Sequence, residues 1–460
     1  MAVRSWLVCI ALCATSDVAV AAPAETLPVA HVASEGPALT FDFPALQIGV
    51  AEYEEGPTGA TVILFRNPVA AVVDVRGGAP GTVNTDLLRL GLDAPVVNAI
   101  TLAGGSAYGL SVATGVANAL KERTADPGNW KNIAVVPAAI IFDLGGRRYN
   151  SVTPDERLGR AALDGVRAGW VPLGARGAGR FAMQGAYFGE IQHSGQGAAF
   201  RQWGEIKVLV VTVVNALGSI VDRKGRMLRC AHPVAGDCGP IAERIASHFA
   251  ALGVAKTASA EAAKRAGPTA NTTLTVVVTN QTLPHWALQR LAVQVHNSMA
   301  RAIQPFGTEF DGDTLFAVST GELKQASIST ADLGTFASEV AWDAILASAP
   351  VLSAPAARTE VRLSSADAEA YRGQYEFAPG AIAEVRPAGA GMEMQVAGRA
   401  SLYIPADKWV SLTSLGKDEF ELVSPRADRL RFDRDGSGRI VGLTINPGPW
   451  PIHARRLTAR

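Results

Sequence analysis

The chain has 460 residues, in which 42 lysine and arginine residues balance 42 aspartate and glutamate residues. A chain without net charge has no electrostatic attraction for nucleic acid or for anionic membrane surfaces, which excludes both from the leading hypotheses about its partners. Hydrophobic residues make up 48% of the sequence, which is enough to bury a core and excludes intrinsic disorder and small disulfide-rich scaffolds.

The first element in chain order is a short apolar segment. Arg4 precedes an apolar run from Trp6 to Ala14, and small residues at positions 19–22 come just before Pro23. This order is typical of a secretory signal peptide, and the run is too short to span a membrane. We therefore predict that residues 1–22 are removed and that the protein is periplasmic or secreted, without a membrane anchor.

Up to about residue 346, apolar runs alternate with helical patterns. Strands are expected at residues 46–50, 61–65, 72–75, 96–102, 133–142, 207–214, 274–279 and 315–319. Most of these runs are apolar on both faces, so the strands are expected to be covered on both sides, in stacked layers. Apolar stripes predict helices near residues 110–120, 288–302 and 333–344.

Cys230 and Cys238 are the two cysteines that remain after removal of the signal peptide. In an oxidising compartment they can close a small disulfide, and two unpaired loop thiols are the alternative. Two cysteines do not make a zinc site, and the seven histidines do not cluster. The sequence therefore predicts neither a metal nor an organic cofactor.

A segment rich in proline, alanine and serine, residues 347–357, predicts a linker after a first domain of residues 23–346. In residues 358–460 short strands with period two predict a small β barrel or sandwich. There, Asp433, Asp435 and Gly436 resemble the opening of a calcium loop. Thr444 stands where such a loop needs glutamate, so a hairpin turn is predicted instead.

The strongest chemical signal is a polar stretch that ends at Asn271, directly before Thr272 and a β-prone run. The sequence has no G-x-S-x-G, H-E-x-x-H or Walker motif. If the chain cleaves itself between Asn271 and Thr272, the new α-amino group, with a pKa of about 7.7 to 8.0, can act as the base for the hydroxyl nucleophile. Asp311 and Asp313, two apart on an extended segment, would face the same site. An ordinary strand start and a turn are the alternatives.

Several long blocks resemble the amidohydrolase family that includes nylon-oligomer hydrolase, the L-aminopeptidase/D-esterases and the β-aminopeptidases. The blocks are FDFPALQIGVAEYEEGPTGATVI, VDVRGGAPGTVNTDLL, ITLAGGSAYGL, SGQGAAFR, NTTLTVVVTN and QPFGTEFDGDTLFAV, spread over residues 41–346. The resemblance implies a hydrolase of the N-terminal-nucleophile type with a four-layer αββα sandwich. It also implies a precursor that cuts itself into two subunits, and a homo-oligomer of the cut protomers.

Carried onto this sequence, the resemblance implies a cut between Asn271 and Thr272. Thr272 then matches the nucleophile, with Asp311 and Asp313 as the acidic residues beside it. Asn215 matches the asparagine whose side-chain amide helps to form the oxyanion hole, where negative charge develops on the amide oxygen of the substrate.

Two positions depart from the pattern of the nylon branch. Phe142 replaces a tyrosine, and Tyr149, seven residues on, is the candidate to fill its place at the substrate pocket. The expected lysine has no counterpart, and Ala186 and Tyr187 are nearest to its position. The substrate pocket is therefore expected to differ from that of the nylon hydrolases.

The C-terminal part resembles the small β barrel appended to some secreted serine β-lactamase-like hydrolases. Tyr371, Gly373 and Tyr375 in AYRGQYEFAPG carry this second resemblance. It implies an accessory domain without chemistry of its own that lines or covers the active-site entrance.

The sequence as a whole predicts a secreted, self-processing amide hydrolase for short peptides, amino-acid amides or related oligoamides. One alternative is an acyltransferase like the ornithine acetyltransferases, in which a second amine replaces water; the predicted signal peptide argues against it, because that biosynthesis is cytoplasmic. Another is a non-catalytic secreted binding protein that keeps the fold and never matures.

Overall fold

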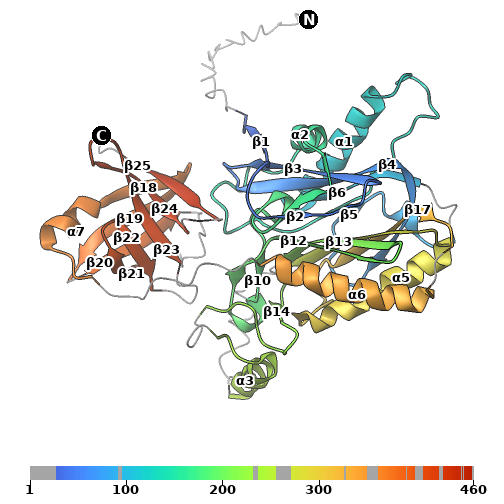
Figure 1. Cartoon of the computed structure of the whole chain (residues 1–460). Helices are drawn as coiled ribbons and strands as arrows, with labels where there is room; N and C mark the ends of the chain where they lie inside the picture. The colour runs from blue at the N-terminus through green and yellow to red at the C-terminus, as the bar shows by residue number, and fades with distance from the viewer. Residues whose placement is uncertain are drawn as a thin grey trace, which may run out of the picture.

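The computed structural model describes residues 27–91, 96–231, 237–254, 271–325, 328–349, 361–389, 391–398, 408–423, 428–446, 448 and 450–457. The predicted signal peptide and most of the predicted linker, from residue 350 on, lie outside these ranges. A layered N-terminal part and a C-terminal β barrel lie side by side (Figure 1). Within the described residues, no helix combines the length and the apolarity that a membrane span needs.

One large sheet runs through the N-terminal part. Its main path has the order β12-β13-β15-β17-β4-β6-β7-β5, with β3 paired to β4, and β1 and β8 paired to β3. The strands are β1 (Ala30–Val32), β3 (Leu46–Tyr53), β4 (Thr58–Val75), β5 (Thr82–Val83), β6 (Val96–Ala103), β7 (Ala138–Ile140), β8 (Arg167–Ala168), β12 (Gln196–Trp203), β13 (Ile206–Asn215), β15 (Thr272–Gln281) and β17 (Thr314–Leu323). Most pairs are antiparallel, whereas β15 and β17 are parallel neighbours.

The long strand β4 belongs to both layers of the sandwich. Its residues 58–65 pair with β3, and its residues 70–75 pair with β17. Between these halves lies the exposed Pro68, which has no N–H to donate to a ladder. The sequence predicted two separate strands here, and the structure joins them in one continuous strand.

The strand β7 is shorter than predicted. The apolar run covers residues 133–142, but only Ala138–Ile140 pair as a strand. Pro137 precedes this strand and cannot donate a hydrogen bond, although its carbonyl oxygen accepts one from Thr101 at 3.1 Å. The proline therefore sets the point at which pairing begins.

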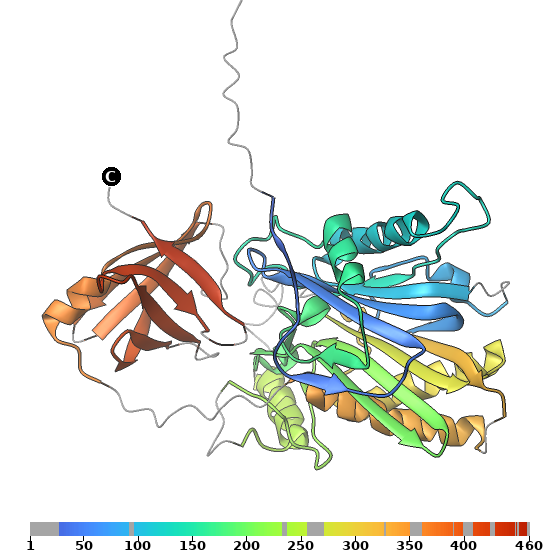
Figure 2. The same ribbon diagram turned by 45° about the horizontal axis from the view of Figure 1, so that its top comes forward.

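Helices cover both outer faces of the layers (Figures 1 and 2). α1 (Ser111–Glu122) and α2 (Glu156–Asp164) pack on the side of β3, β4 and β6, whereas α5 (His285–Ser298) and α6 (Thr330–Ala347) pack on the side of β12, β13 and β17. One apolar cluster lies between the two layers, and one lies beneath each helix pair. The αββα sandwich expected from the sequence is confirmed.

Local chemistry explains where the helices of the second face begin. Pro284 takes the N-cap position of α5, and Ser329 caps α6 by accepting a hydrogen bond from the Asp332 N–H at 3.1 Å. The stripes predicted from the sequence are buried beneath them: Leu288, Leu291, Val295, Leu333, Val340 and Ala344.

Short elements join these layers. The strand pairs are β2 (Ala38–Thr40) with β9 (Trp170–Pro172), β10 (Met183–Gln184) with β11 (Gln192–His193), and β14 (Ser219–Ile220) with β16 (Ile303–Gln304). The remaining elements are α3 (Ile241–Val254), η1 (Asp86–Leu88), η2 (Ser106–Leu110), η3 (Gly177–Gly179), η4 (Ala186–Phe188) and η5 (Met299–Arg301). A disulfide joins Cys230 to Cys238, whose Cα atoms are 5.6 Å apart.

The C-terminal part is a closed antiparallel barrel, again as expected from the sequence. Its strands are β18 (Gly373–Ala378), β19 (Ala381–Ala388), β20 (Gly391–Gly398), β21 (Val410–Gly416), β22 (Glu419–Leu422), β23 (Arg429–Arg434), β24 (Ile440–Ile445) and β25 (Ile452–Arg456), and α7 (Ser365–Tyr371) packs against β19. Tyr375, Phe420 and Phe432 are fully buried in its core.

The segment that resembles a calcium loop forms the hairpin between β23 and β24. The Asp435 carboxylate accepts hydrogen bonds from the backbone N–H groups of Ser437 and Arg439, at 2.9 and 3.0 Å. The acidic side chain therefore stabilises a turn. The sequence predicted this hairpin turn because residue 444 is threonine and not the glutamate of a calcium loop.

Candidate active site

The junction of Asn271 and Thr272 lies at the start of β15, in the middle of the large sheet. Thr272 is buried, with 3% of its surface exposed. Its hydroxyl donates a hydrogen bond to the carbonyl oxygen of Asn271 at 2.5 Å. The hydroxyl oxygen thus lies against the carbonyl group of the peptide bond that the sequence predicts to be cut.

The backbone amide of Gly312 holds the same carbonyl group. Its N–H donates to the Asn271 oxygen at 2.6 Å. A side chain at Gly312 has no room, because a Cβ atom there would lie 2.5 Å from Thr272 Oγ1 and 2.8 Å from the Ala79 carbonyl oxygen. A fixed N–H donor stabilises the negative charge that develops on a carbonyl oxygen when its carbon is attacked. The Asn271 carbonyl oxygen therefore accepts two hydrogen bonds, from the Thr272 hydroxyl and from the Gly312 amide.

Asp313 is held by two backbone amides. Thr273 N–H donates to its Oδ1 at 2.6 Å, and Gly307 N–H donates to its Oδ2 at 3.0 Å. Burial and, next, the negative charge of Asp311 raise the pKa of Asp313 to about 7, against the lowering effect of the two amides. A carboxyl group with such a pKa can exchange a proton near neutral pH.

Asp311 connects the acidic segment, residues 311–313, to the end of β13 by a hydrogen bond. Its Oδ2 accepts hydrogen bonds from the Thr308 N–H at 3.0 Å and the Thr308 hydroxyl at 2.6 Å, and its Oδ1 accepts one from the Leu217 N–H at 3.3 Å. Leu217 lies two residues beyond Asn215, the last residue of β13, so Asp311 helps to fix the position of this strand end. Among the described residues, no group of three or more His, Cys, Asp or Glu side chains is arranged to hold a metal ion.

Asn215 is the direct partner of Thr272 in the register of β13 and β15. Residues opposite each other on antiparallel strands point their side chains to the same face, about 5 Å apart at Cβ. The Asn215 side chain is also oriented, because its Oδ1 accepts from Met183 N–H at 3.0 Å and its Nδ2 donates to the Phe142 carbonyl oxygen at 3.1 Å. The nitrogen of a side-chain carboxamide carries two hydrogens, so Nδ2 keeps one of them to donate to a further oxygen.

These residues lie within a stretch that matches a known family. A model of the peptidase family S58 matches residues 38–360. The chain belongs to peptidase family S58. Membership makes this chain an amide-bond hydrolase, and it confirms the family resemblance drawn from the sequence blocks.

Individual relatives of this S58 hydrolase match more than half of its chain. The 6-aminohexanoate-oligomer endohydrolase of Paenarthrobacter ureafaciens is 40% identical over 326 residues, which are 67% of this chain and 85% of that protein. An uncharacterized aminopeptidase of Mycobacterium tuberculosis is 37% identical over 270 residues, 57% of this chain and 73% of that protein. The solved structure of a Burkholderia sp. beta-aminopeptidase covers 67% of this chain and 84% of that chain, with a TM-score of 0.48 and 18% identity.

The S58 match ends at residue 360, so the barrel from residue 361 on lies beyond it. Within the match, the structure brings four of the predicted site residues together: Thr272, Asp311, Asp313 and Asn215. Phe142 joins them through its backbone carbonyl on Asn215.

Tyr149 was predicted as a candidate for the substrate pocket of this S58 hydrolase, and it stays a prediction. Its side chain is half-buried against the apolar cluster of the C-terminal barrel. Tyr187, nearest to the position of the missing lysine, packs its ring against Phe188 and His248, at centroid distances of 5.0 and 4.7 Å. The Arg148 guanidinium also lies over the Tyr149 ring, 5.0 Å from its centroid.

Sequence reasoning missed the loop that supports the acidic segment. Ala79 N–H donates to the Asp311 carbonyl oxygen at 2.8 Å, and Arg76 N–H donates to the Asp313 carbonyl oxygen at 3.0 Å. At Gly77 a Cβ atom would lie 2.1 Å from the Asp311 carbonyl oxygen. A glycine pair directly after a strand was the available signal, because it marks a close approach of two backbones.

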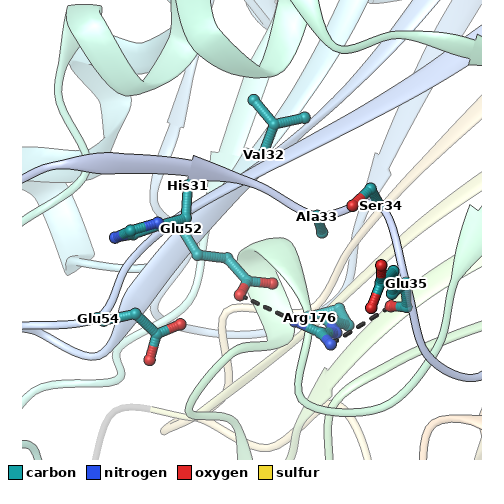
Figure 3. Close-up of a pocket in the computed structure, with 8 residues that line it drawn as sticks. All are labelled: His31, Val32, Ala33, Ser34, Glu35, Glu52, Glu54 and Arg176. Atoms are coloured by element: carbon teal, nitrogen blue, oxygen red, sulfur yellow. Dashed lines mark hydrogen bonds and ion pairs between the residues drawn. The ribbon is translucent and has the colours of Figure 1, made fainter.

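A polar hollow of about 230 Å³ lies at a different place, lined by residues 31–35 with Glu52, Glu54 and Arg176. Figure 3 shows the Glu52 carboxylate joined to Arg176. Glu52 Oε2 lies 3.4 Å from Arg176 Nη1, and Glu54 pairs with Arg180 at 2.8 Å. Glu52 and Glu54 are thus each paired with an arginine, and Thr272 and its neighbours do not line this hollow.

Proposed function

We propose that this S58 hydrolase cuts its own chain between Asn271 and Thr272 and then hydrolyses amide bonds of short peptides, amino-acid amides or related oligoamides. The observation that carries the proposal is the double contact at the Asn271 carbonyl. The Thr272 hydroxyl and the Gly312 amide both lie on this one carbonyl group, at 2.5 and 2.6 Å from its oxygen.

The self-cleavage proceeds through an ester. Thr272 Oγ1 attacks the Asn271 carbonyl carbon while Gly312 N–H stabilises the oxygen, and the bond from that carbon to the Thr272 nitrogen breaks. The hydroxyl proton ends on the departing nitrogen, with the carboxyl group of Asp313 as the nearby group suited to carry it. Water then hydrolyses the ester, which leaves a carboxylate on Asn271 and a free amine and hydroxyl on Thr272.

Turnover uses the new amine as the base. Its unperturbed pKa of about 7.7 to 8.0 lets it accept the hydroxyl proton at neutral pH and deliver it to the leaving amine. The Asn215 carboxamide donates to the oxygen of the substrate carbonyl, on the same face as Thr272. Asp311 and Asp313 keep these groups in place, and water releases the acyl group from Thr272.

The choice of substrates rests on the relatives and on charge. The relatives carry the names 6-aminohexanoate-oligomer endohydrolase and aminopeptidase, which denote hydrolysis of an oligoamide and of peptides. A neutral chain suits a substrate that is recognised by an uncharged amide backbone. The departures at Phe142 and at the missing lysine favour a pocket with its own selectivity among these amides.

The test compares the wild type with Thr272→Ala. We expect the wild type to yield two bands, the second with Thr272 at its N-terminus by sequencing, and to release product from a panel of aminoacyl amides, dipeptides and 6-aminohexanoate oligomers. Thr272→Ala should stay uncut and inactive. Thr279→Ala, on the same strand and equally buried, is the matched control and should be cut normally.

Other outcomes identify the rivals. A wild type that stays a single inactive chain would leave a binding protein that retains the fold. Acyl transfer to an added amine, with little hydrolysis in water, would favour the acyltransferase.

Export and assembly complete the proposal. The protein is exported and loses residues 1–22, and its cut protomers form a homo-oligomer. An N-terminus near Pro23 in protein recovered from the periplasm or medium, and a light-scattering mass of several protomers, are the expected results. A cytoplasmic product with Met1 intact would contradict export, and a mass of one protomer would contradict assembly.

A further inference from the structure

A buried tryptophan makes one of the contacts between the barrel and the hydrolase sandwich. Trp450, between β24 and β25, is 3% exposed. Its indole stacks on the imidazole of His193 with a centroid distance of 4.9 Å and an interplanar angle of 10°, and its Nε1–H donates to the Ser194 carbonyl oxygen at 3.2 Å. Both partners belong to the segment of the β10–β11 hairpin, so the barrel holds this hairpin from outside.

Two further side chains enclose the same contact. The Arg229 guanidinium lies 5.2 Å from the indole centroid and donates to the His193 carbonyl oxygen at 3.0 Å. The Phe181 ring packs edge-on against the His193 ring, with 5.0 Å between the centroids. Phe181 is itself buried in the apolar cluster of the barrel core. The hairpin is therefore held by aromatic packing, by a cation over a ring, and by two hydrogen bonds to its backbone carbonyls.

The same hairpin segment also contacts Asn215 and its neighbour Val214. Met183, in β10, donates its N–H to Asn215 Oδ1 at 3.0 Å, and the Ser194 hydroxyl donates to the Val214 carbonyl oxygen at 2.5 Å. Ser194 N–H also donates to the Ala182 carbonyl oxygen at 3.0 Å, which joins the two arms of the hairpin. The hairpin thus connects Trp450 to the residue opposite Thr272.

We propose that Trp450 is a positioning residue of the hydrolase, which acts through the β10–β11 hairpin to fix the carboxamide of Asn215. A carboxamide has an acceptor end and a donor end, and the Met183 N–H selects the orientation in which Nδ2 is the end left for the substrate oxygen. Displacement of a catalytic group by about 1 Å through a distant mutation can lower the rate about 100-fold. The proposal rests on the proposed function, and it gives the barrel a role in the chemistry of the sandwich.

The experiment uses the full chain with Trp450→Ala, Trp450→Phe and Trp409→Ala. Trp409 is the matched control, a barrel tryptophan that packs on Arg386 at 3.6 Å. We expect Trp450→Ala to lower kcat at least about tenfold with KM nearly unchanged, and Trp450→Phe, which keeps a ring on His193, to fall between it and the wild type. Trp409→Ala should keep the wild-type kcat.

A double-mutant cycle separates positioning from simple destabilisation. In a chain that already carries Asn215→Ala, Trp450→Ala should have almost no further effect on kcat, because both changes act on the same donor. Additive losses, or an unchanged kcat in a cleaved Trp450→Ala protein, would overturn the proposal. If Trp450→Ala does not fold, Trp450→Phe carries the cycle alone. An uncut, inactive wild type would instead refute the proposed function itself.

Discussion

The acidic segment of residues 311–313 and the Trp450 contact both join parts of the chain that are far apart in sequence, but they are built from different forces. In the acidic segment, backbone amides donate to carboxylates and carbonyls at fixed positions, as at Asp313 and Gly312. At Trp450, ring stacking and one hydrogen bond hold the partners. Changes in the acidic segment should therefore act in an all-or-none way, whereas changes at the barrel contact should be graded.

The pKa values of acidic side chains also shift in opposite directions in the barrel and in the site. In the barrel, hydrogen bonds from Arg434 hold the pKa of Asp418 below its usual range. In the site, burial raises the pKa of Asp313 instead. An arginine partner keeps a carboxylate charged, while burial beside another carboxylate makes its charge costly. Only the second arrangement provides a group that exchanges protons near neutral pH.

The largest expected effect is that of Gly312→Ala, which tests the all-or-none behaviour. The new methyl group would meet Thr272 Oγ1 at 2.5 Å and the Ala79 carbonyl oxygen at 2.8 Å. We expect self-cleavage to be abolished, with a loss of about 1 to 3 kcal/mol in the free energy of unfolding. Intact mass and urea unfolding measure the two effects. Gly436→Ala in the barrel, where a Cβ meets nothing within 4 Å, is the control, and normal cleavage in Gly312→Ala would refute the steric argument.

Next in size is Asn215→Ala, which removes the proposed side-chain donor to the substrate oxygen. Loss of one such donor typically lowers kcat about 10²-fold to 10³-fold. Asn280→Ala is the matched control, because Asn280 is also buried and bonds the backbone of Lys207 and Glu205 at the far end of the same strand pair. Steady-state kinetics should show a fall in kcat for the first variant alone. Equal losses in both would point to stability rather than chemistry.

A smaller effect is expected on the pH dependence of stability. The pKa of Asp313 is raised from 3.8 to about 7, so the folded chain holds a proton that the unfolded chain has lost over this range. The stabilising contribution is complete below about pH 4 and is lost as the pH rises to about 7. Urea unfolding of the uncut Thr272→Ala chain at pH 5 and 8 should show this decline, and adding Asp313→Asn should flatten it. An unchanged slope would mean that Asp313 is ionised throughout.

The smallest effects compare the two parts through their helix caps. Ser329 caps α6 of the sandwich and Ser364 caps α7 beside the barrel, each by accepting a hydrogen bond from an aspartate N–H at 3.1 Å. Alanine at either position should cost about 1 kcal/mol. Calorimetry then reports whether each variant shifts its own thermal transition. A common shift of one transition would show that the barrel and the sandwich unfold together.

Much of the fold could be predicted from the sequence, because apolar runs and helical stripes report burial directly. The layers, the helices of the second face and the barrel followed from them. The continuous strand β4 did not, because the pairing of residues 58–65 and 70–75 with different neighbours is decided by the whole sheet. A local pattern around Pro68 shows only an interruption.

The site was accessible to sequence reasoning where a residue type carries chemistry. Thr272 at the head of a strand, with Asp311 and Asp313 nearby in sequence, suggested a nucleophile and its neighbours, and resemblance added Asn215. Gly312 was hidden, because its contribution is a backbone N–H and an absent side chain. Trp450 was hidden because its hydrogen bond spans 256 residues. Such contacts depend on tertiary structure alone.

The order of strands around β15 has a consequence for how the protein can be made. In the sheet, β15 and β17 lie between β13 on one side and β4 on the other. After the proposed cut, β15 and β17 would belong to the C-terminal product, and their neighbours β13 and β4 to the N-terminal product. The two products should therefore migrate as one particle under native conditions. Once the two products are separated in denaturant, they should not reassemble readily, because β15 and β17 take their central place in the sheet while the chain is still uncut.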